Sequence, residues 1–187
     1  MHRHYGAKKS ALFSTLPSTI VELGPGCGAN FRYLRPGTRV IAIEPNQHMH
    51  PALHAAARRH QLELDVSSER ARLAELDSGS VGAVIATLVL CTVDDPAATL
   101  REVHRVLQPS GRFVGIEHVA APPASFIGRL QRWVFRPWRW CFEGCHTHRD
   151  TAQTLQEGPF SQVRIERFDV RSWFVPIRPH ISVVATK

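Results

Sequence analysis

The sequence lacks any uncharged stretch long enough to cross a membrane as a helix. Its longest run without Asp, Glu, Lys or Arg covers residues 78–93, only 16 positions, and is rich in Val and Ile, whereas a spanning helix needs about 20 apolar residues. The basic N-terminus has no apolar segment of the kind found in signal peptides. We therefore expect a cytoplasmic protein with no transmembrane anchor in this chain.

Cysteine is scarce, and acidic residues are outnumbered. The cysteines, at positions 27, 91, 141 and 145, form no C-x-x-C pair, which favours a reduced intracellular protein over a disulfide framework. Lys and Arg number 23 against 16 Asp and Glu, a net charge of +7, which attracts anions without identifying them. With 43% apolar and 21% charged residues in 187 positions, the composition excludes disorder and predicts a single domain over 1–187.

Strand-like and helix-like segments alternate along the chain, which predicts an α/β fold: a doubly wound, Rossmann-like and mostly parallel sheet. We expect a helix over 52–60 and another that opens at Asp94, Asp95 and Pro96 and is stopped by Pro109 and Gly111. An aromatic, irregular insertion is expected at about 122–159. The expected strands cover 20–23, 39–43, 61–64, 81–90 and 112–118, followed by an antiparallel closing pair at 163–170 and 176–185.

The strongest motif is Val21-Glu22-Leu23-Gly24-Pro25-Gly26-Cys27-Gly28, at the end of the first expected strand. Glycines there let the backbone turn tightly and approach a ligand. Gly24, Gly26 and Ala29 also satisfy a dinucleotide fingerprint, but a lone match of that kind is weak. Glu22 would repel a pyrophosphate and would attract an ammonium group, which argues against NAD.

Glu44 ends the second expected strand, 20 residues after Gly24. Its carboxylate can accept two hydrogen bonds from the vicinal hydroxyls of a ribose. Ser67, Ser68 and Glu69 follow the third strand, where a nucleoside base would lie, although a helix N-cap explains these residues equally well.

These motifs, with Leu107-Gln108-Pro109-Ser110-Gly111 before the fifth strand, resemble class I S-adenosylmethionine (SAM) methyltransferases. Three further segments are similar to those of the methyltransferase-like alkyl-thiol S-methyltransferases of animal microsomes and their bacterial relatives: Thr87-Leu88-Val89-Leu90-Cys91, Glu117-His118-Val119 and Gly144-Cys145-His146. The animal members carry an N-terminal membrane anchor, which we do not expect in this chain.

The resemblance implies the class I methyltransferase fold, with SAM as the cofactor and S-adenosylhomocysteine as its product. It implies methyl transfer to a small acceptor, the sulfur of an apolar thiol before the oxygen or nitrogen of a small natural product. A SAM-binding protein without catalysis is the remaining alternative. The cofactor contacts it implies are Glu22, Gly24, Gly26, Gly28, Asn30, Glu44, Pro45, Asn46, Ser68, Glu69, Thr87 and Leu88.

The acceptor should bind beyond the carboxyl ends of the strands, near Cys91, Glu117 and His118. His118 is the near-neutral base there, so we assign it the catalytic role of orienting or deprotonating the acceptor, with packing at the strand end as the alternative. Direct transfer needs no nucleophilic cysteine, and Cys91 is interpreted as lining. We also place His146 on the substrate side.

Residues 129–140 interleave four Arg with three Trp and a Phe. The rings Trp133, Trp138, Trp140 and Phe142 are expected to close an apolar acceptor pocket. Peripheral contact with an anionic membrane is the second interpretation, ahead of plain core packing, and nucleic acid is not expected as a partner. Cys141, Cys145, His146 and His148 match no common zinc spacing, so no metal is predicted. The oligomeric state cannot be deduced.

Overall fold

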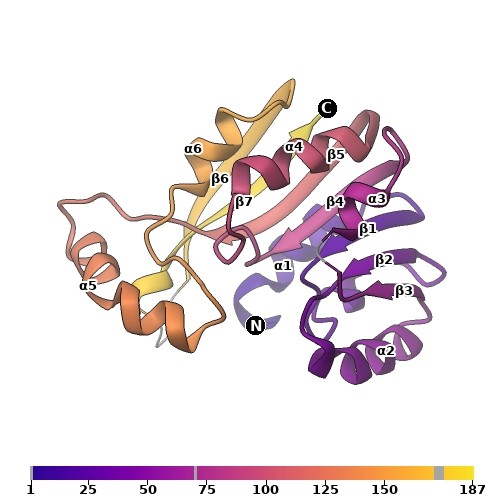
Figure 1. The fold of residues 1–187 in the computed structure, drawn as a ribbon, viewed down its shortest axis with the longest axis horizontal. Coiled ribbons are helices and arrows are strands. Elements are labelled where there is room, and N and C mark those ends of the chain that lie inside the picture. Colours follow the sequence, from indigo (N-terminus) through magenta and orange to yellow (C-terminus); the bar gives the residue numbers. More distant parts are fainter. Residues whose placement is uncertain (1, 70, 171–174) are drawn as a thin grey trace.

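The fold is built on one sheet, which the computed structural model shows within the residues it describes, 2–69, 71–170 and 175–187 (Figure 1). Seven strands in these ranges follow the order β3-β2-β1-β4-β5-β7-β6. The first five are mutually parallel, and β7 runs antiparallel to both of its neighbours. The predicted mostly parallel sheet with an antiparallel last strand is therefore confirmed. The strands are β1 (Thr19–Leu23), β2 (Arg39–Ile43), β3 (Glu63–Ser67), β4 (Val81–Thr87), β5 (Leu107–His118), β6 (Gln162–Asp169) and β7 (Pro179–Thr186).

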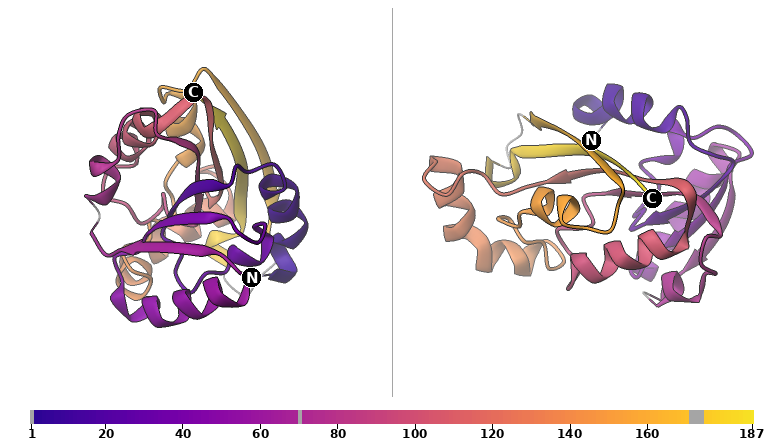
Figure 2. Two further views of the ribbon diagram at one scale, coloured as in Figure 1. Left: turned by 90° about the vertical axis from the view of Figure 1, so that its right-hand side faces the viewer. Right: turned by 90° about the horizontal axis from the view of Figure 1, so that it is seen from above.

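Helices cover both faces of the sheet (Figure 2). On one face, α1 (His2–Phe13) and α2 (His50–Arg59) pack with the 3-10 turn η1 (Phe31–Tyr33). On the other face lie α3 (Arg72–Glu75), α4 (Pro96–Val106) and α6 (Thr151–Gln156). The longest helix, α5 (Phe126–Cys141), lies beyond the end of the sheet (Figure 1), near the turn η3 (Val175–Ile177). A further turn, η2 (Gln47–Met49), precedes α2.

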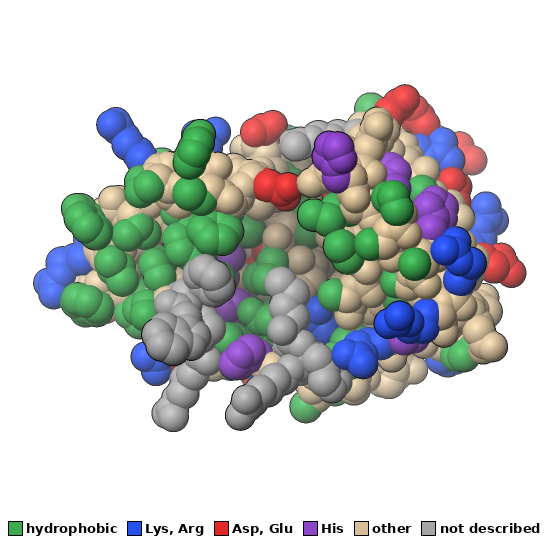
Figure 3. All heavy atoms as spheres, turned by 90° about the horizontal axis from the view of Figure 1, so that it is seen from below, with side chains coloured by type: hydrophobic (Ala, Val, Ile, Leu, Met, Phe, Trp, Pro, Cys, Tyr) green, Lys and Arg blue, Asp and Glu red, His purple; other side chains and the backbone are tan. Residues whose placement is uncertain are grey.

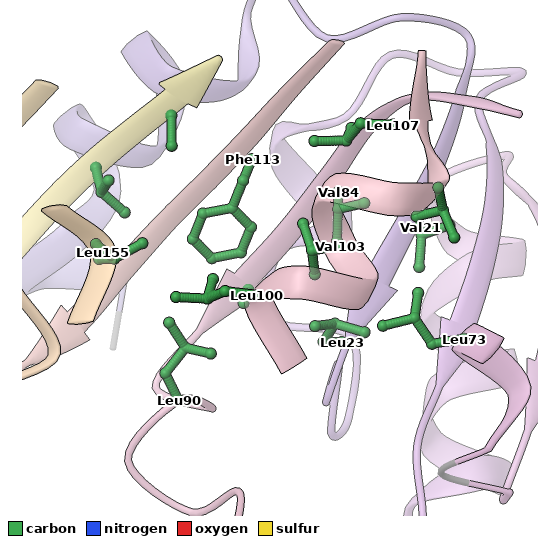
Figure 4. Packing of buried hydrophobic residues seen from close by; sticks show 14 of the residues in the cluster. Val21, Leu23, Leu73, Val84, Leu90, Leu100, Val103, Leu107, Phe113 and Leu155 are labelled. Atoms are coloured by element: carbon green, nitrogen blue, oxygen red, sulfur yellow. The ribbon is translucent and has the colours of Figure 1, made fainter. Parts of the chain in front are cut away.

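The larger core cluster lies between the sheet and α4 (Figure 4). Leu100 and Val103 of α4 are fully buried, as are Val84 of β4 and Phe113 of β5. Burial of each such side chain contributes roughly 1.5–3 kcal/mol. Because this core packs α4 against one face of the sheet, the strands are held in fixed positions and their carboxyl ends share one edge.

The start of α4 follows the sequence prediction. The side chain of Asp95 accepts a hydrogen bond of 2.8 Å from the backbone N–H of Ala98, and Pro96 occupies the first helical turn. Such a cap satisfies an N–H that the helix itself cannot pair, worth about 1 kcal/mol. The cap fixes where the chain leaves the β4 turn and enters the helix.

Several expected boundaries are wrong. The third strand occupies 63–67 instead of 61–64, because Gln61 takes a positive φ of 56° in the turn after α2. Strand β4 ends at Thr87 instead of Leu90, because Leu88 has φ 59° and the chain turns there. Helix α4 ends at Val106, and β5 begins at Leu107 instead of Arg112.

The segment 122–159 is more regular than the sequence suggests, since it contains α5 and α6. Pro137 lies inside α5 and does not end it. A proline removes one helical hydrogen bond, and the helix continues to Cys141, where the N–H of Phe142 still donates to the carbonyl of Trp138. Within the described ranges, no helix has the length and apolar character needed to span a membrane.

Candidate active site

A cavity of about 840 Å³ opens at the carboxyl ends of β1, β2 and β4. This is the edge where ligands of open parallel sheets bind. Its described lining residues are Leu23, Gly24, Gly26, Ile43, Glu44, Pro45, Asn46, Met49, Leu73, Ala74, Leu88, Val89, Thr92, Val93, Asp94, Asp95, Ala98, Thr99, Glu102 and Glu143.

The glycine loop after β1 forms one wall of this cavity. Gly24, Gly26 and Gly28 have φ of 55°, 57° and 78°, a region that other residues rarely adopt. A Cβ on Gly24 would approach the Val89 side chain to 2.8 Å, whereas a Cβ on Gly26 would meet nothing within 4 Å. Gly26 therefore presents bare backbone to the cavity, as a closely bound ligand requires.

Beneath the loop lies a buried polar group made of Glu22, Asn30 and Thr87. The Asn30 amide donates to Glu22 Oε1 at 2.7 Å and to Thr87 Oγ1 at 3.1 Å. Burial raises the pKa of Glu22 to about 7, against the opposing effect of the Asn30 hydrogen bond. Lys9 of α1, itself buried, lies near enough to lower that pKa electrostatically.

Two oxygen atoms of this group have no hydrogen-bond partner among the described residues: Glu22 Oε2 and Asn30 Oδ1. A buried acceptor left unpaired costs about 1–3 kcal/mol. An ammonium group supplies up to three N–H donors and would pair both oxygens. The residues present therefore fit the ammonium of a methionine moiety.

Glu44 lies at the cavity wall with both carboxylate oxygens already oriented. Its Oε2 accepts from Gly26 N–H at 2.8 Å and its Oε1 accepts from Asn46 N–H at 2.9 Å. Each oxygen keeps a second lone pair, so the pair can still accept from two ribose hydroxyls. The backbone hydrogen bonds lock the side chain in the orientation that this role needs.

The cavity is acidic although the protein is basic. Its lining includes five carboxylates, from Glu44, Asp94, Asp95, Glu102 and Glu143. Such a surface attracts a cation and repels a pyrophosphate, so the electrostatics agree with the sulfonium of SAM and not with a dinucleotide. Asp94 and Asp95 entered the sequence prediction only as the start of a helix. Asp94 and Asp95 come soon after the end of β4 in the sequence, and this position could have identified them as residues of the site.

Next to this cavity, Glu117 and His118 end β5 and are both buried. Glu117 Oε1 accepts from Val89 N–H at 2.9 Å, while Glu117 Oε2 lacks a partner in the described part of the chain. Burial raises the pKa of Glu117 to about 7. A carboxyl that titrates near neutrality suits proton transfer, a property that sequence analysis did not foresee for this residue.

His118 contacts a pair of cysteines. Its Nε2 lies 3.1 Å from Cys145 Sγ, and Trp138 Nε1 donates to the same sulfur at 3.4 Å. Hydrogen bonds from Cys91, His118 and Trp138 to its sulfur lower the pKa of Cys145. The pKa of Cys91 is raised, because Cys91 donates the hydrogen bond to Cys145 and because it is buried. His146 is held nearby, its N–H donating to the Cys91 carbonyl at 2.9 Å.

Six of the twelve predicted cofactor residues are in the described lining of the cavity: Gly24, Gly26, Glu44, Pro45, Asn46 and Leu88. Glu22, Gly28, Asn30 and Thr87 lie in or beneath the loop, outside that lining. Ser68 and Glu69 lie outside its described lining, and Ser68 instead accepts a hydrogen bond from Gln47. The described lining contains no aromatic ring. Trp138 stacks on Phe142 with ring centroids 4.2 Å apart, whereas Trp133 and Trp140 are 82% and 88% exposed. Figure 3 shows hydrophobic side chains gathered over the end of the molecule formed by α5.

Comparison with known proteins agrees with this geometry. A model of the methyltransferase domain family matches residues 21–115. Human thiol S-methyltransferase TMT1B is 37% identical, over 100% of this chain and 81% of the relative. Human thiol S-methyltransferase TMT1A is 36% identical, over 97% and 79%. Among solved structures, a SAM-dependent methyltransferase of Thermotoga maritima, described as a possible histamine N-methyltransferase, has a TM-score of 0.67 and 19% identity, covering 100% of this chain and 91% of that one.

Proposed function

The chain belongs to the thiol S-methyltransferase family of SAM-dependent methyltransferases, and we propose that its methyl acceptor is the sulfur of a small apolar thiol. The observation that carries this proposal is the 37% identity to human thiol S-methyltransferase TMT1B across the whole chain. The site supports it, because a thiol ionises with a pKa near 8.5 and needs only a modest base.

SAM supplies an electrophilic methyl group on a positively charged sulfur. In our proposal Glu22 and Asn30 hold the ammonium, Glu44 holds the ribose, and the bare backbone at Gly26 lets the ligand lie close to the loop. Holding donor and acceptor in line supplies a large part of the rate by itself, on the order of several kcal/mol. The fixed edge of the sheet provides that alignment.

The acceptor thiol must lose its proton at the carboxyl ends of β4 and β5. We assign proton acceptance to the adjacent pair Glu117 and His118, both buried and each with one polar atom unpaired among the described residues, Glu117 Oε2 and His118 Nδ1. Because both side chains are buried, the thiol would give up its proton in a site that excludes bulk water. Dry surroundings also favour transfer from a sulfonium, since charge disperses in the transition state.

Turnover with matched acceptors tests the proposal. An alkyl thiol, the corresponding alcohol and the corresponding amine are each incubated with enzyme and SAM, and the methylated products are measured by mass spectrometry. We expect the thiol to react at least about tenfold faster than either analogue. Preference for the alcohol or the amine would replace the thiol by an oxygen or nitrogen acceptor. SAM binding without any product would make the chain a SAM-binding protein.

We also propose that the protein is cytoplasmic and binds anionic membranes peripherally through α5. Phe126, Trp133 and Trp140 recur every seven residues, so they lie along one face of the helix, and all three are strongly exposed. The opposite side is anchored to the protein. Gln131 is fully buried there and its amide donates to the carbonyls of Val119 and Pro176.

Gly128 explains why the anchored side lies so close to the protein. A Cβ at this position would come within 2.3 Å of the Pro122 carbonyl oxygen. The helix thus turns Gly128 and Gln131 inward, together with half-buried apolar side chains such as Val134, and leaves the rings of Trp133 and Trp140 exposed. Four arginines, at 129, 132, 136 and 139, accompany the rings. Rings with arginines fit the boundary between anionic headgroups and acyl chains.

A further inference from the structure

Three buried side chains with soft donor atoms meet at the carboxyl ends of β4 and β5. They are Cys91, after β4, His118, the last residue of β5, and Cys145, after α5. Their exposed fractions are 2%, 1% and 7%. The two sulfur atoms and the imidazole nitrogen all lie within 4.8 Å of one another, and no other such group occurs in the described part of the chain.

Contacts other than those among the three donor atoms hold the donors together: backbone hydrogen bonds and the side chain of Arg149. The N–H of His146 donates to the Cys91 carbonyl at 2.9 Å, which ties the Cys145 turn to the β4 turn. Arg149 donates to the carbonyls of Leu90 and Val93 at 2.6 and 2.7 Å. His118 is fixed by the pairing of β5 with β7, where it lies opposite His180. The cluster is therefore organised by the fold before any ligand binds.

The donor set matches the preferences of one kind of ion. Thiolate and imidazole are the ligands that Zn²⁺ takes most often. Bond lengths of about 2.3 Å to sulfur and 2.0–2.1 Å to nitrogen would place tetrahedral ligand atoms roughly 3.5–3.8 Å apart. His118 Nε2 lies 3.1 Å from Cys145 Sγ, so small side-chain rotations would open the space for the ion.

Charge is the second argument. The forms of Cys91 and Cys145 that bind a metal are thiolates, and two buried thiolates would repel each other in a medium of low dielectric without a cation between them. A divalent cation neutralises both. We propose that Cys91, His118 and Cys145 bind one Zn²⁺ ion, which fastens the turn after α5 to the ends of β4 and β5 and leaves a fourth coordination position for a ligand from outside this set. With Nε2 bound to the ion, the imidazole of His118 keeps its proton on Nδ1. In the zinc-bound protein Glu117 is therefore the proton acceptor and His118 is a metal ligand.

The proposed ligands differ from those that the sequence spacing brings to mind. Cys141 is exposed at the end of α5. His146 and His148 both pack against the ring of Phe135, with centroids 5.0 and 4.7 Å away. Cys145 alone of the 141–148 group joins the cluster. Its partners Cys91, after β4, and His118, at the end of β5, lie 54 and 27 positions earlier in the chain.

Metal content tests the proposal without any assay of methyl transfer. The full chain is purified under reducing conditions, and zinc is measured by elemental mass spectrometry. It is then replaced by Co²⁺, whose thiolate charge-transfer absorption reports sulfur ligation. We expect about one zinc per chain and the thiolate band. Cys145→Ser and His118→Gln should each lower Zn²⁺ affinity at least tenfold, whereas Cys141→Ser, a cysteine removed outside the cluster, should retain it.

Circular dichroism shows whether each variant is folded. If one of the two ligand variants misfolds, the other still tests the proposal. Zinc below about one tenth per chain in the folded wild type, with no thiolate band from Co²⁺, would overturn the proposal. So would folded Cys145→Ser and His118→Gln proteins with wild-type zinc content. A Cys91–Cys145 disulfide in a metal-free protein would assign the cluster to redox chemistry instead.

Discussion

The amide nitrogen of Asn30 lies 2.7 Å from Glu22 Oε1, and both side chains are buried beneath the glycine loop. One oxygen of each residue faces no donor among the described residues. The pair is thus a preformed acceptor for a cation, oriented by the fold and not by the ligand. In our proposal this pair binds the ammonium of SAM, which would pair the two oxygens that have no donor.

Ionisation of Glu22 should make SAM binding dependent on pH. Its pKa in the free protein is raised by burial to about 7, so the carboxylate is charged above that pH and protonated below it. We expect SAM affinity to fall as the pH is lowered through 7 and to level off only well above pH 7, where the carboxylate is fully charged. Calorimetry from pH 6 to 8 measures this. In Glu22→Gln the affinity should be lower by at least tenfold and insensitive to pH, and a pH-dependent variant would contradict the assignment.

Removal of the Glu44 carboxylate should weaken SAM binding at least tenfold. Two charge-assisted hydrogen bonds to ribose are lost, each worth roughly 1.5–3 kcal/mol. Glu44→Ala also frees the N–H groups of Gly26 and Asn46, so we expect a lower Tm. Glu69→Ala is the matched control, because Glu69 is exposed and outside the described cavity lining. Equal losses in the two variants would return Glu69 to the base-binding role predicted from the sequence.

The pH–rate profile should reveal the proton acceptor. At pH 7 we expect Glu117→Gln and His118→Ala each to lower kcat/KM by about 10²-fold, the usual contribution of a general base. The loss should shrink toward pH 9, since the thiol then ionises without help. Steady-state kinetics with an alkyl thiol measures both. A variant whose loss is the same at every pH has lost positioning and not proton transfer. Zinc analysis of the same samples separates this effect from loss of the metal in His118→Ala.

Two glycines of the loop should respond differently to alanine. At Gly28 a Cβ would meet Ala56 Cβ at 2.8 Å and the Phe31 ring at 3.0 Å, with φ at 78°. We therefore expect Gly28→Ala to lower the free energy of unfolding by about 1–3 kcal/mol. At Gly26 only the positive φ opposes a side chain, so Gly26→Ala should destabilise less and weaken SAM binding more. Urea unfolding and calorimetry give the two rankings, and a reversed order would refute the assignment of the cavity wall.

Sedimentation with vesicles tests the outward face of α5. Binding to vesicles that contain phosphatidylserine should be lost in Trp133→Ala/Trp140→Ala and weakened by salt, because the arginine contribution is screened. Arg129→Ala/Arg136→Ala should weaken it as well. The matched control, Arg58→Ala/Arg59→Ala, removes two exposed arginines from α2 and should bind as the wild type does. Methylation of a soluble thiol should be unchanged in the tryptophan variant. Reduced activity without any loss of vesicle binding would restore the pocket role of these rings.

The sequence predicts the fold, and it brings Gly24, Gly26 and Glu44 to the cavity, because both depend on local patterns. That these residues bind SAM stays a prediction. Gly24, Gly26 and Gly28 permit the positive φ values of a tight turn. An acid at the end of a parallel strand, such as Glu44, lies at the carboxyl edge of the sheet, where ligands bind in folds of this kind. A parallel sheet with helices on both faces follows from the alternation of strands and helices, whereas the class I topology is what the resemblance implies. These features needed no knowledge of long-range contacts.

The acceptor end is harder to predict, because its properties arise from burial and distant partners. Nothing near Glu117 in the sequence reveals that burial raises its pKa to about 7. Cys91 and Cys145 are 54 positions apart and meet only through the folded α5 connection. The sequence likewise does not show that the rings of Trp133 and Trp140 face outward. Their direction depends on the packing of Gly128 against the Pro122 carbonyl and on the burial of Gln131.

The position of β7 has a consequence for synthesis of the protein. This strand is the last of the described elements to leave the ribosome, yet it lies between β5 and β6. Until it emerges, β5 is an unpaired edge that exposes its hydrogen-bonding groups, and β6 has no partner. The nascent chain can assemble its cofactor half early, but the strand that carries Glu117 and His118 stays open on one side until residues 179–186 have emerged. The acceptor end is therefore completed only after the last described strand has emerged, and until then the unfinished sheet is exposed to aggregation.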